Sequence, residues 1–109
     1  MKPGNLFLNS KGEIKIGDFG FAGRIEEVRK QNYYSIGSPG YMSPETVNRN
    51  EYSHNTDIWS LGIIYYELLT GELPWAGKTE EQINLNMTPD NLRLALLKPE
   101  IDEESRSFL

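Results

Sequence analysis

Residues 57–70, which are predicted to form a helix, constrain the fold of this chain more than any other stretch. Apolar side chains point in nearly every direction around this helix: Ile58, Trp59, Leu61, Ile63, Ile64, Tyr65, Tyr66, Leu68 and Leu69. Thr56 is a suitable N-cap, Asp57 suits the positive start of the helix, and Gly71 provides a C-terminal stop. A helix that is apolar all round is buried on every side. One small domain has little chain to cover such a helix, so we expect these 109 residues to be part of a larger folded unit.

The composition excludes several classes of function. The chain has 11 basic and 16 acidic residues and a net charge of -5, which argues against a nucleic-acid-binding surface. It has no cysteine, which rules out disulfides and cysteine-based zinc or thiol chemistry. The single histidine, His54, excludes a histidine-rich metal site and is interpreted as a surface-loop residue. No apolar run approaches the roughly 20 residues that span a bilayer, and no signal segment follows Met1. We therefore expect no membrane segment and a cytosolic or nuclear location.

The chain begins with a predicted β-hairpin. Leu6 and Leu8 alternate along its first segment, and Ile14 and Ile16 alternate along its second. Residues 9–12 between them are rich in turn-forming types and end in a glycine that can adopt a positive φ. This pattern predicts two short antiparallel strands joined by a tight turn.

A loop-like stretch follows the hairpin. Residues 19–50 carry several glycines and prolines. A long irregular segment inside a compact domain is usually functional. A short helix is predicted to start near Pro44, because Ser43 can cap it and proline is favoured in the first turn.

Two more helices are predicted nearer the C-terminus. Thr79 is expected to cap a helix over residues 79–87, with Gln82 completing the capping pattern. Residues 88–90 are interpreted as a break, and a further helix is predicted to begin at Asp102. The predicted fold class is therefore mainly α with a short N-terminal β-hairpin.

The ends of the hairpin bring two oxygen-bearing side chains together. Asn5 lies just before the first strand and Asp18 just after the second. An amide oxygen and a carboxylate side by side are hard ligands that suit Mg²⁺. Lys2, close by in the sequence, would neutralise a phosphate near the same metal. Considered one by one, these residues are more simply interpreted as a turn residue, a loop cap and a solvated charge.

Several motifs, taken in order, resemble the C-terminal lobe of the eukaryotic protein kinases. Lys2-Pro3-Gly4-Asn5 resembles the end of the catalytic loop that follows H-R-D, and Asp18-Phe19-Gly20 resembles the D-F-G metal motif. Ser43-Pro44-Glu45 resembles A-P-E, with serine in place of alanine. Asp57-Ile58-Trp59-Ser60-Leu61-Gly62 resembles the start of the family's central buried helix, and Leu73-Pro74-Trp75 the motif after it. The resemblance covers essentially the whole chain, and so many ordered motifs make a chance match negligible.

This resemblance implies an ATP- and Mg²⁺-dependent enzyme that transfers the γ-phosphoryl group of ATP to a protein substrate. The lysine at position 2 resembles the serine/threonine kinases, and details near Phe21 and Trp75 are most similar to the calmodulin-dependent and autophagy-initiating branches. Asp18 would hold the Mg²⁺ that bridges the ATP phosphates, Asn5 would hold a second Mg²⁺, and Lys2 would contact the transferred phosphoryl group.

The resemblance also assigns the loop. Residues 18–45 would be the activation segment, whose start includes Phe19, packed in an apolar spine, and Gly20. Tyr34 and Ser35 are candidate phosphorylation sites there. The floor that receives the substrate residue after the phosphoacceptor would be formed by Gly37, Ser38 and Pro39.

The chain departs from the family pattern at its start. It carries no glycine-rich loop, no ATP-pairing lysine and no H-R-D, so we expect a partial kinase domain over residues 1–109 that is inactive alone. Met1 falls where the residue after H-R-D would stand, so we expect the chain to begin at an internal methionine of a longer sequence. The family partners of Glu45 and Asp57 would also be absent. Because an unpaired buried carboxylate is costly, we expect these acids to stay in water or the fold to be weakened.

Two alternatives to a kinase segment remain at this point. One is a non-catalytic remnant of a kinase lobe that docks a kinase, a substrate or a scaffold through its helical surface. The other is a product without function. The intact motifs argue against long decay, and the retained Asn5 and Asp18 would have no metal role in a docking module.

Overall fold

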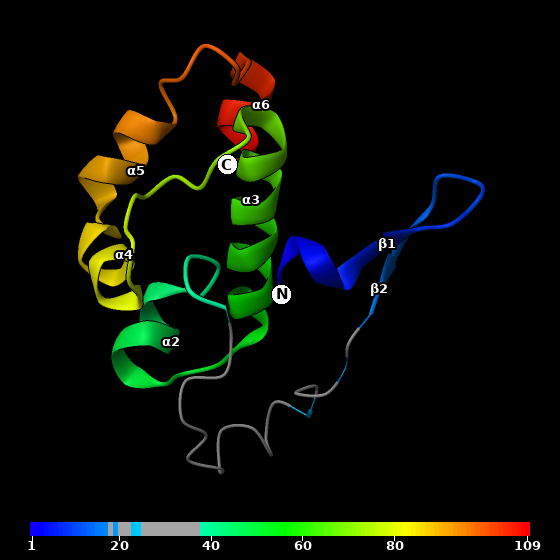
Figure 1. Cartoon of the computed structure of the whole chain (residues 1–109), viewed down its shortest axis with the longest axis horizontal. Helices are drawn as coiled ribbons and strands as arrows, with labels where there is room; N and C mark the ends of the chain where they lie inside the picture. Colours follow the sequence, from blue (N-terminus) through cyan, green and yellow to red (C-terminus); the bar gives the residue numbers. More distant parts are fainter. Residues whose placement is uncertain (18, 20–22, 25–37) are drawn as a thin grey trace.

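The computed structural model describes residues 1–17, 19, 23–24 and 38–109. In these ranges the chain forms a 3-10 turn η1 (Pro3–Asn5), two strands and five helices, in the order β1 (Leu6–Leu8), β2 (Ile14–Ile16), α2 (Pro44–Arg49), α3 (His54–Thr70), α4 (Glu80–Asn86), α5 (Pro89–Ala95) and α6 (Glu103–Phe108). Helix α3 runs along one edge of the helical body, with α2, α4 and α5 on one side of it, and the hairpin projects on the other side (Figure 1). This arrangement confirms the predicted fold class. None of the helices in the described ranges is long and apolar enough to cross a membrane.

The N-terminal hairpin has the predicted register. Strands β1 and β2 pair antiparallel, with Leu6 opposite Ile16 and Phe7 opposite Lys15. The Asn9 side-chain oxygen closes the turn by accepting from the backbone N–H groups of Lys11 and Glu13, each at 2.9 Å. A side chain of this type is suited to such a turn because it can mimic a backbone acceptor.

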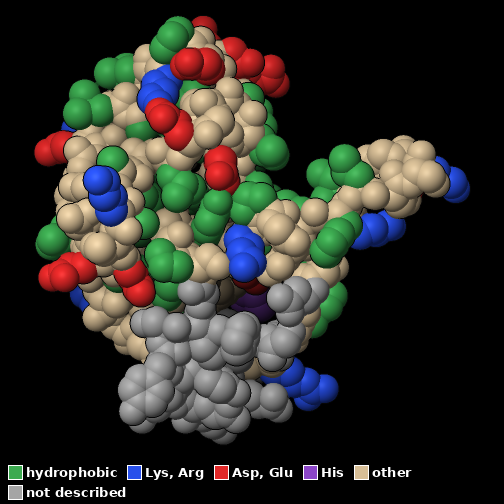
Figure 2. Space-filling view, in the orientation of Figure 1, with side chains coloured by type: hydrophobic (Ala, Val, Ile, Leu, Met, Phe, Trp, Pro, Cys, Tyr) green, Lys and Arg blue, Asp and Glu red, His purple; other side chains and the backbone are tan. Residues whose placement is uncertain are grey.

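The hairpin is short and is not packed on the helices. Phe7, Leu8, Ile14 and Ile16 are 53–73% exposed. Figure 2 shows these hydrophobic side chains along the arm that extends from the body. An isolated two-stranded hairpin is only marginally stable, so its order rests on its turn and on its junction with η1.

Helix α3 begins earlier than predicted. It starts at His54 rather than at Asp57, and its N-cap is Ser53 rather than Thr56. The Ser53 hydroxyl accepts from the Asn55 N–H at 3.2 Å, while the Thr56 hydroxyl accepts from the Ser53 N–H at 3.0 Å. The sequence interpretation was wrong here because it overlooked this reciprocal pair. At the other end Gly71 adopts a left-handed φ of 79°, as the C-terminal stop requires.

The described residues cover only part of the apolar surface of α3. Ile64 and Tyr66 are each 1% exposed, but Ile58, Leu61 and Leu68 are 66%, 41% and 74% exposed. The elements described here cover one side of the helix only. That side meets a core cluster of Tyr66, Ala95 and Ile101, against which Leu69, Leu96 and Leu109 pack.

Three short helices follow α3, one of which the sequence interpretation missed. Thr79 caps α4 and Asp102 caps α6 through their side-chain oxygens, as predicted. Residues 88–90, interpreted as a break, instead start α5: the Thr88 hydroxyl accepts from the Asn91 N–H at 3.2 Å. The threonine and proline that suggested a break also form a good helix start.

The Ser53 cap gives a first test. Ser53→Ala removes an acceptor at the start of the longest helix and is expected to lower the free energy of unfolding by about 1 kcal/mol. Ser107→Ala is the matched control, because Ser107 is exposed and lies within α6; it should change stability by less than about 0.5 kcal/mol. Urea unfolding of both variants measures the difference, and equal effects would contradict the assigned cap.

Candidate functional site

Two predicted site residues lie at the two ends of the first turn. The Asn5 N–H donates to the Lys2 carbonyl at 3.0 Å, which closes η1 around Pro3 and Gly4. The Gly17 N–H then donates to the Asn5 carbonyl at 2.8 Å. The base of the hairpin therefore brings Asn5 beside Gly17, the residue before Asp18. Asp18 itself lies outside the described residues.

The chemistry around Asn5 fits a magnesium ligand. The Asn5 side chain is half-buried, and its amide forms no hydrogen bond with any described residue, so its oxygen is available. The Lys2 side chain is exposed. No group of three or more histidine, cysteine, aspartate or glutamate residues in the described ranges could hold a metal ion. Among the described residues, the Asn5 amide oxygen is thus the side-chain donor at the hairpin base that suits a hard cation such as Mg²⁺.

The predicted substrate floor begins at the edge of the described residues. Gly37 lies outside them, whereas Ser38 is half-buried and Pro39 is exposed. Directly after Pro39 the chain turns inward, because Gly40 is buried and Met42 is only 6% exposed. The Tyr41 N–H donates back to the Ser38 carbonyl at 3.3 Å and closes this turn. Ser38 and Pro39 therefore lie on the outer side of a turn whose following residues are buried.

Two side chains of helix α3, those of Ser60 and Glu67, bond Tyr41 in the turn that includes Ser38 and Pro39. The Ser60 hydroxyl, in a residue that is 3% exposed, donates to the Tyr41 carbonyl at 2.8 Å. The Tyr41 hydroxyl donates to Glu67 Oε2 at 2.6 Å. The sequence analysis missed the role of Ser60 and Glu67. Their signal was that they are polar residues among the apolar side chains of residues 58–69, where a buried polar group needs a partner.

The loop after α3 contacts the same turn through Trp75, which bonds the Gly40 carbonyl. The Trp75 indole N–H donates to the Gly40 carbonyl at 3.1 Å, and its ring stacks on Trp59 with centroids 5.9 Å apart. Gly40 has a φ of +90°, and a Cβ there would lie 2.7 Å from Leu73 Cδ1. Only glycine fits this approach without displacement of Leu73. Trp75 therefore anchors the backbone directly after Pro39 to the loop that follows α3.

The Tyr41–Glu67 contact gives a pH test. Burial, and then the hydrogen bond and charge of Glu67, raise the pKa of Tyr41 to about 12. In the unfolded chain a tyrosine ionises near pH 10. The stabilisation is therefore complete below pH 10 and is lost as the pH rises through 12. Urea unfolding of the wild type and of Tyr41→Phe should converge over this range, and a constant difference up to pH 12 would contradict the assignment.

Other predicted residues are less closely associated with this site. Phe19 is 67% exposed, so it packs in no apolar cluster of the described residues. Asp57 is exposed and Glu45 is half-buried, and the side-chain carboxylate of neither forms a hydrogen bond or ion pair with a described residue. Gly20, Tyr34 and Ser35 lie outside the described residues.

The α2 helix next to the floor is fixed by an internal hydroxyl pair. Ser43, its N-cap, is 0% exposed, and its hydroxyl bonds that of Thr46 at 3.0 Å instead of capping a backbone N–H. Thr46 in turn donates to the Glu51 carbonyl at 2.8 Å. These bonds tie both ends of α2 together, directly after the floor.

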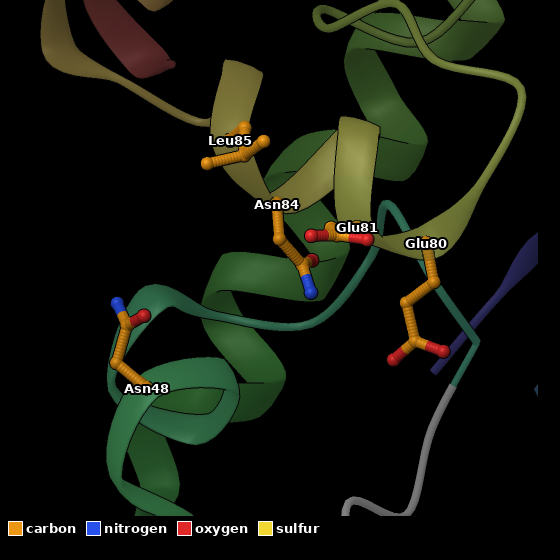
Figure 3. A pocket seen from close by; sticks show the side chains of 5 residues that line it. All are labelled: Asn48, Glu80, Glu81, Asn84 and Leu85. Atoms are coloured by element: carbon orange, nitrogen blue, oxygen red, sulfur yellow. The ribbon is translucent and has the colours of Figure 1, made fainter.

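A shallow hollow lies between α2 and α4. Figure 3 shows the side chains that line it: Asn48, Glu80, Glu81, Asn84 and Leu85. Glu80 and Glu81 occupy the first turn of α4, where the positive helix end favours carboxylates. The position of these acids in the helix accounts for them without a ligand.

Comparison with known proteins agrees with this geometry. The model of the protein kinase domain family matches residues 1–108. The serine/threonine-protein kinase CST20 of Candida albicans is 44% identical over 79 residues, which is 72% of this chain and 6% of that protein. The human ribosomal protein S6 kinase alpha-1 is 42% identical over 82 residues, 75% of this chain and 11% of the kinase. A Caenorhabditis elegans protein similar to the cAMP-dependent protein kinase catalytic subunit is 42% identical over 83 residues, 76% of this chain and 20% of that protein.

The chain thus spans only a small part of the length of these relatives. The matched part contains the hairpin, the anchored floor and α3. The family match covers nearly every residue, and the relatives are themselves serine/threonine kinases by name. The chain therefore belongs to the eukaryotic serine/threonine protein kinase superfamily.

Proposed function

We propose that residues 1–109 form the metal-binding and substrate-supporting part of an ATP- and Mg²⁺-dependent serine/threonine protein kinase. The observation that carries this proposal is the anchored turn at Ser38–Tyr41. Its outer residues are accessible, while Ser60, Glu67 and Trp75 fix it from two different elements. Such rigid support is what phosphoryl transfer needs, because its catalysis rests mainly on positioning and electrostatic stabilisation.

The hairpin base supplies the second half of the proposed site. The Asn5 amide oxygen and the Asp18 carboxylate would hold Mg²⁺, and the exposed Lys2 ammonium would balance charge on the transferred phosphoryl group. When bound, the metal supplies positive charge that offsets the charge on the phosphate oxygens. Asn5 is suited to this role because its side chain has no other partner in the described ranges.

The proposal also covers residues 18–45 and the location of the enzyme in the cell. Residues 18–45 would act as the activation segment, in which phosphorylation of Tyr34 or Ser35 adds negative charge that changes the order of the loop. A protein segment carrying serine or threonine would lie on Gly37, Ser38 and Pro39. We place the enzyme in the cytosol or nucleus and expect residues 1–109 alone to be inactive, because they carry no H-R-D motif.

A docking module is the second candidate, and one observation favours it. Ile58, Leu61 and Leu68 form an apolar stripe along α3 that no described residue covers. A non-catalytic lobe would bind its partner through this stripe. Leu61→Glu would then abolish partner binding, whereas it would leave the metal site at Asn5 unchanged.

The metal site is tested with Mn²⁺ and ATP on the isotope-labelled chain. Mn²⁺ takes the same oxygen ligands as Mg²⁺ and broadens the signals of nearby amides. The proposal predicts the strongest broadening at Asn5 and Gly17, and its loss in Asp18→Asn. Glu13→Gln is the matched control, because Glu13 lies in the hairpin turn. Broadening centred on Glu80 and Glu81, or unchanged in Asp18→Asn, would contradict the proposed site.

A further inference from the structure

The two tryptophans of the stacked pair differ in one respect. The Trp75 indole N–H donates to the Gly40 carbonyl, whereas the Trp59 indole nitrogen is buried and has no hydrogen-bond partner in the described part of the chain. The two rings are stacked, with an interplanar angle of 11°, and Trp59 as a whole is half-buried. Trp75 itself is only 4% exposed, so its hydrogen bond is shielded from water.

The acceptor of that bond, the Gly40 carbonyl, lies directly after the residues of the predicted substrate floor. Gly40 directly follows the exposed Pro39 and has no side chain through which it could be held. Its carbonyl is fixed by Trp75, and the next carbonyl, that of Tyr41, is fixed by Ser60. Two consecutive carbonyls are thus held by two separate elements, which sets the direction in which Ser38 and Pro39 face.

We propose that Trp75 is a positioning residue for the protein substrate: its indole N–H holds the Gly40 carbonyl and thereby orients Ser38 and Pro39 toward a bound peptide. The inference rests on the proposed function of residues 37–39 as the substrate floor. Trp59 contributes ring packing to Trp75 but no hydrogen bond to the floor. Of the two donors that hold these consecutive carbonyls, Trp75 is the one that bonds Gly40, the residue directly after Pro39.

The test compares Trp75→Phe with Trp59→Phe in the full chain. Both changes keep an aromatic ring and remove the same atoms, but only the first removes a donor to the floor. The Tyr41 amide, which bonds the Ser38 carbonyl, should exchange with solvent about tenfold faster in Trp75→Phe, the loss expected for one hydrogen bond. It should change less than about twofold in Trp59→Phe. Equal acceleration in both variants would overturn the inference.

Binding of a serine-containing peptide provides the functional readout. The wild-type chain should show peptide-dependent shifts at Ser38 and Tyr41, with binding weakened about tenfold in Trp75→Phe and unchanged in Trp59→Phe. Equal peptide binding by Trp75→Phe and Trp59→Phe would overturn the positioning role of Trp75 but not the substrate floor itself. Absence of any shift in the wild type would overturn the substrate floor, and the inference with it.

A second replacement of Trp75 keeps the test decisive if Trp75→Phe does not fold. A benzothienylalanine at position 75, in which sulfur replaces the indole N–H, retains the ring shape and lacks the donor. It should reproduce the faster Tyr41 exchange and the weaker peptide binding. Wild-type behaviour of this variant would show that ring packing, and not the hydrogen bond, fixes the floor.

Discussion

Replacing Gly40 with alanine is expected to lower the free energy of unfolding by about 2–3 kcal/mol and to disorder the substrate floor. The φ of +90° alone costs a residue with a side chain about 1–2 kcal/mol. The new Cβ would also lie 2.7 Å from Leu73 Cδ1, so Leu73 must move, which adds about 1 kcal/mol. Urea unfolding and the peptide-binding assay measure the two effects.

Gly12 offers a matched control for this change. Its φ is +78°, but a Cβ there would meet nothing within 4 Å. Gly12→Ala should therefore show only the backbone cost, about 1–2 kcal/mol, and leave peptide binding unchanged. Combining Gly40→Ala with Leu73→Ala should remove the steric part. An effect of Gly40→Ala no larger than that of Gly12→Ala would contradict the close approach of the floor to Leu73.

Replacing Tyr66 with alanine is expected to have the largest effect on stability, about 3–5 kcal/mol. Tyr66 is 1% exposed and packs with Ala95 and Ile101 in the core cluster. Its hydroxyl also donates to the Ala95 carbonyl at 3.2 Å. A loss of this size is comparable to the lower end of the whole stability of a small domain, so the variant should be largely unfolded in mild urea.

Tyr66→Phe separates the ring from the hydroxyl. It keeps the packing of α3 against α5 and removes only the hydrogen bond, so it should cost about 0.5–1.5 kcal/mol. Thermal and urea unfolding of the two variants give the comparison. If Tyr66→Ala were no more destabilising than Tyr66→Phe, the assigned core would be wrong.

Local sequence signals predicted most of the elements, and they failed where two signals competed. The alternation of Leu6 to Ile16 predicted the hairpin, and Thr79 and Asp102 predicted two helix starts, because these are effects of near neighbours. Thr88 and Pro89 suit both a break and a helix start, and only the packing of Ala95 on Tyr66 decides between them. The start of α3 was misplaced because Thr56 is an equally plausible cap when the side chain of Ser53 is not considered.

The sequence predicted the site residues placed by near neighbours and missed those placed by contacts between distant segments. The position of Asn5 at the hairpin base could be predicted because the hairpin register alone brings it to Gly17. Glu67 and Trp75 could not, since their contacts with Tyr41 and Gly40 join segments far apart in the sequence. Such contacts depend on how the loop folds back on α3, which no local pattern specifies. The exposed stripe of Ile58, Leu61 and Leu68 likewise depends on which elements surround α3 and not on its own sequence.

The central claim is tested most directly by phosphotransfer from a chimera. Residues 1–109 would replace the matching segment of the Caenorhabditis elegans relative, which supplies the remaining parts of a kinase domain. The chimera is expected to phosphorylate serine and threonine peptides with Mg²⁺ and ATP, while residues 1–109 alone do not. Asp18→Asn should lower the rate by about 10²–10³, the loss typical of one stabilising electrostatic group, and Glu13→Gln should not. Phosphotransfer by the isolated chain, or a chimera whose rate is unchanged by Asp18→Asn, would contradict the account.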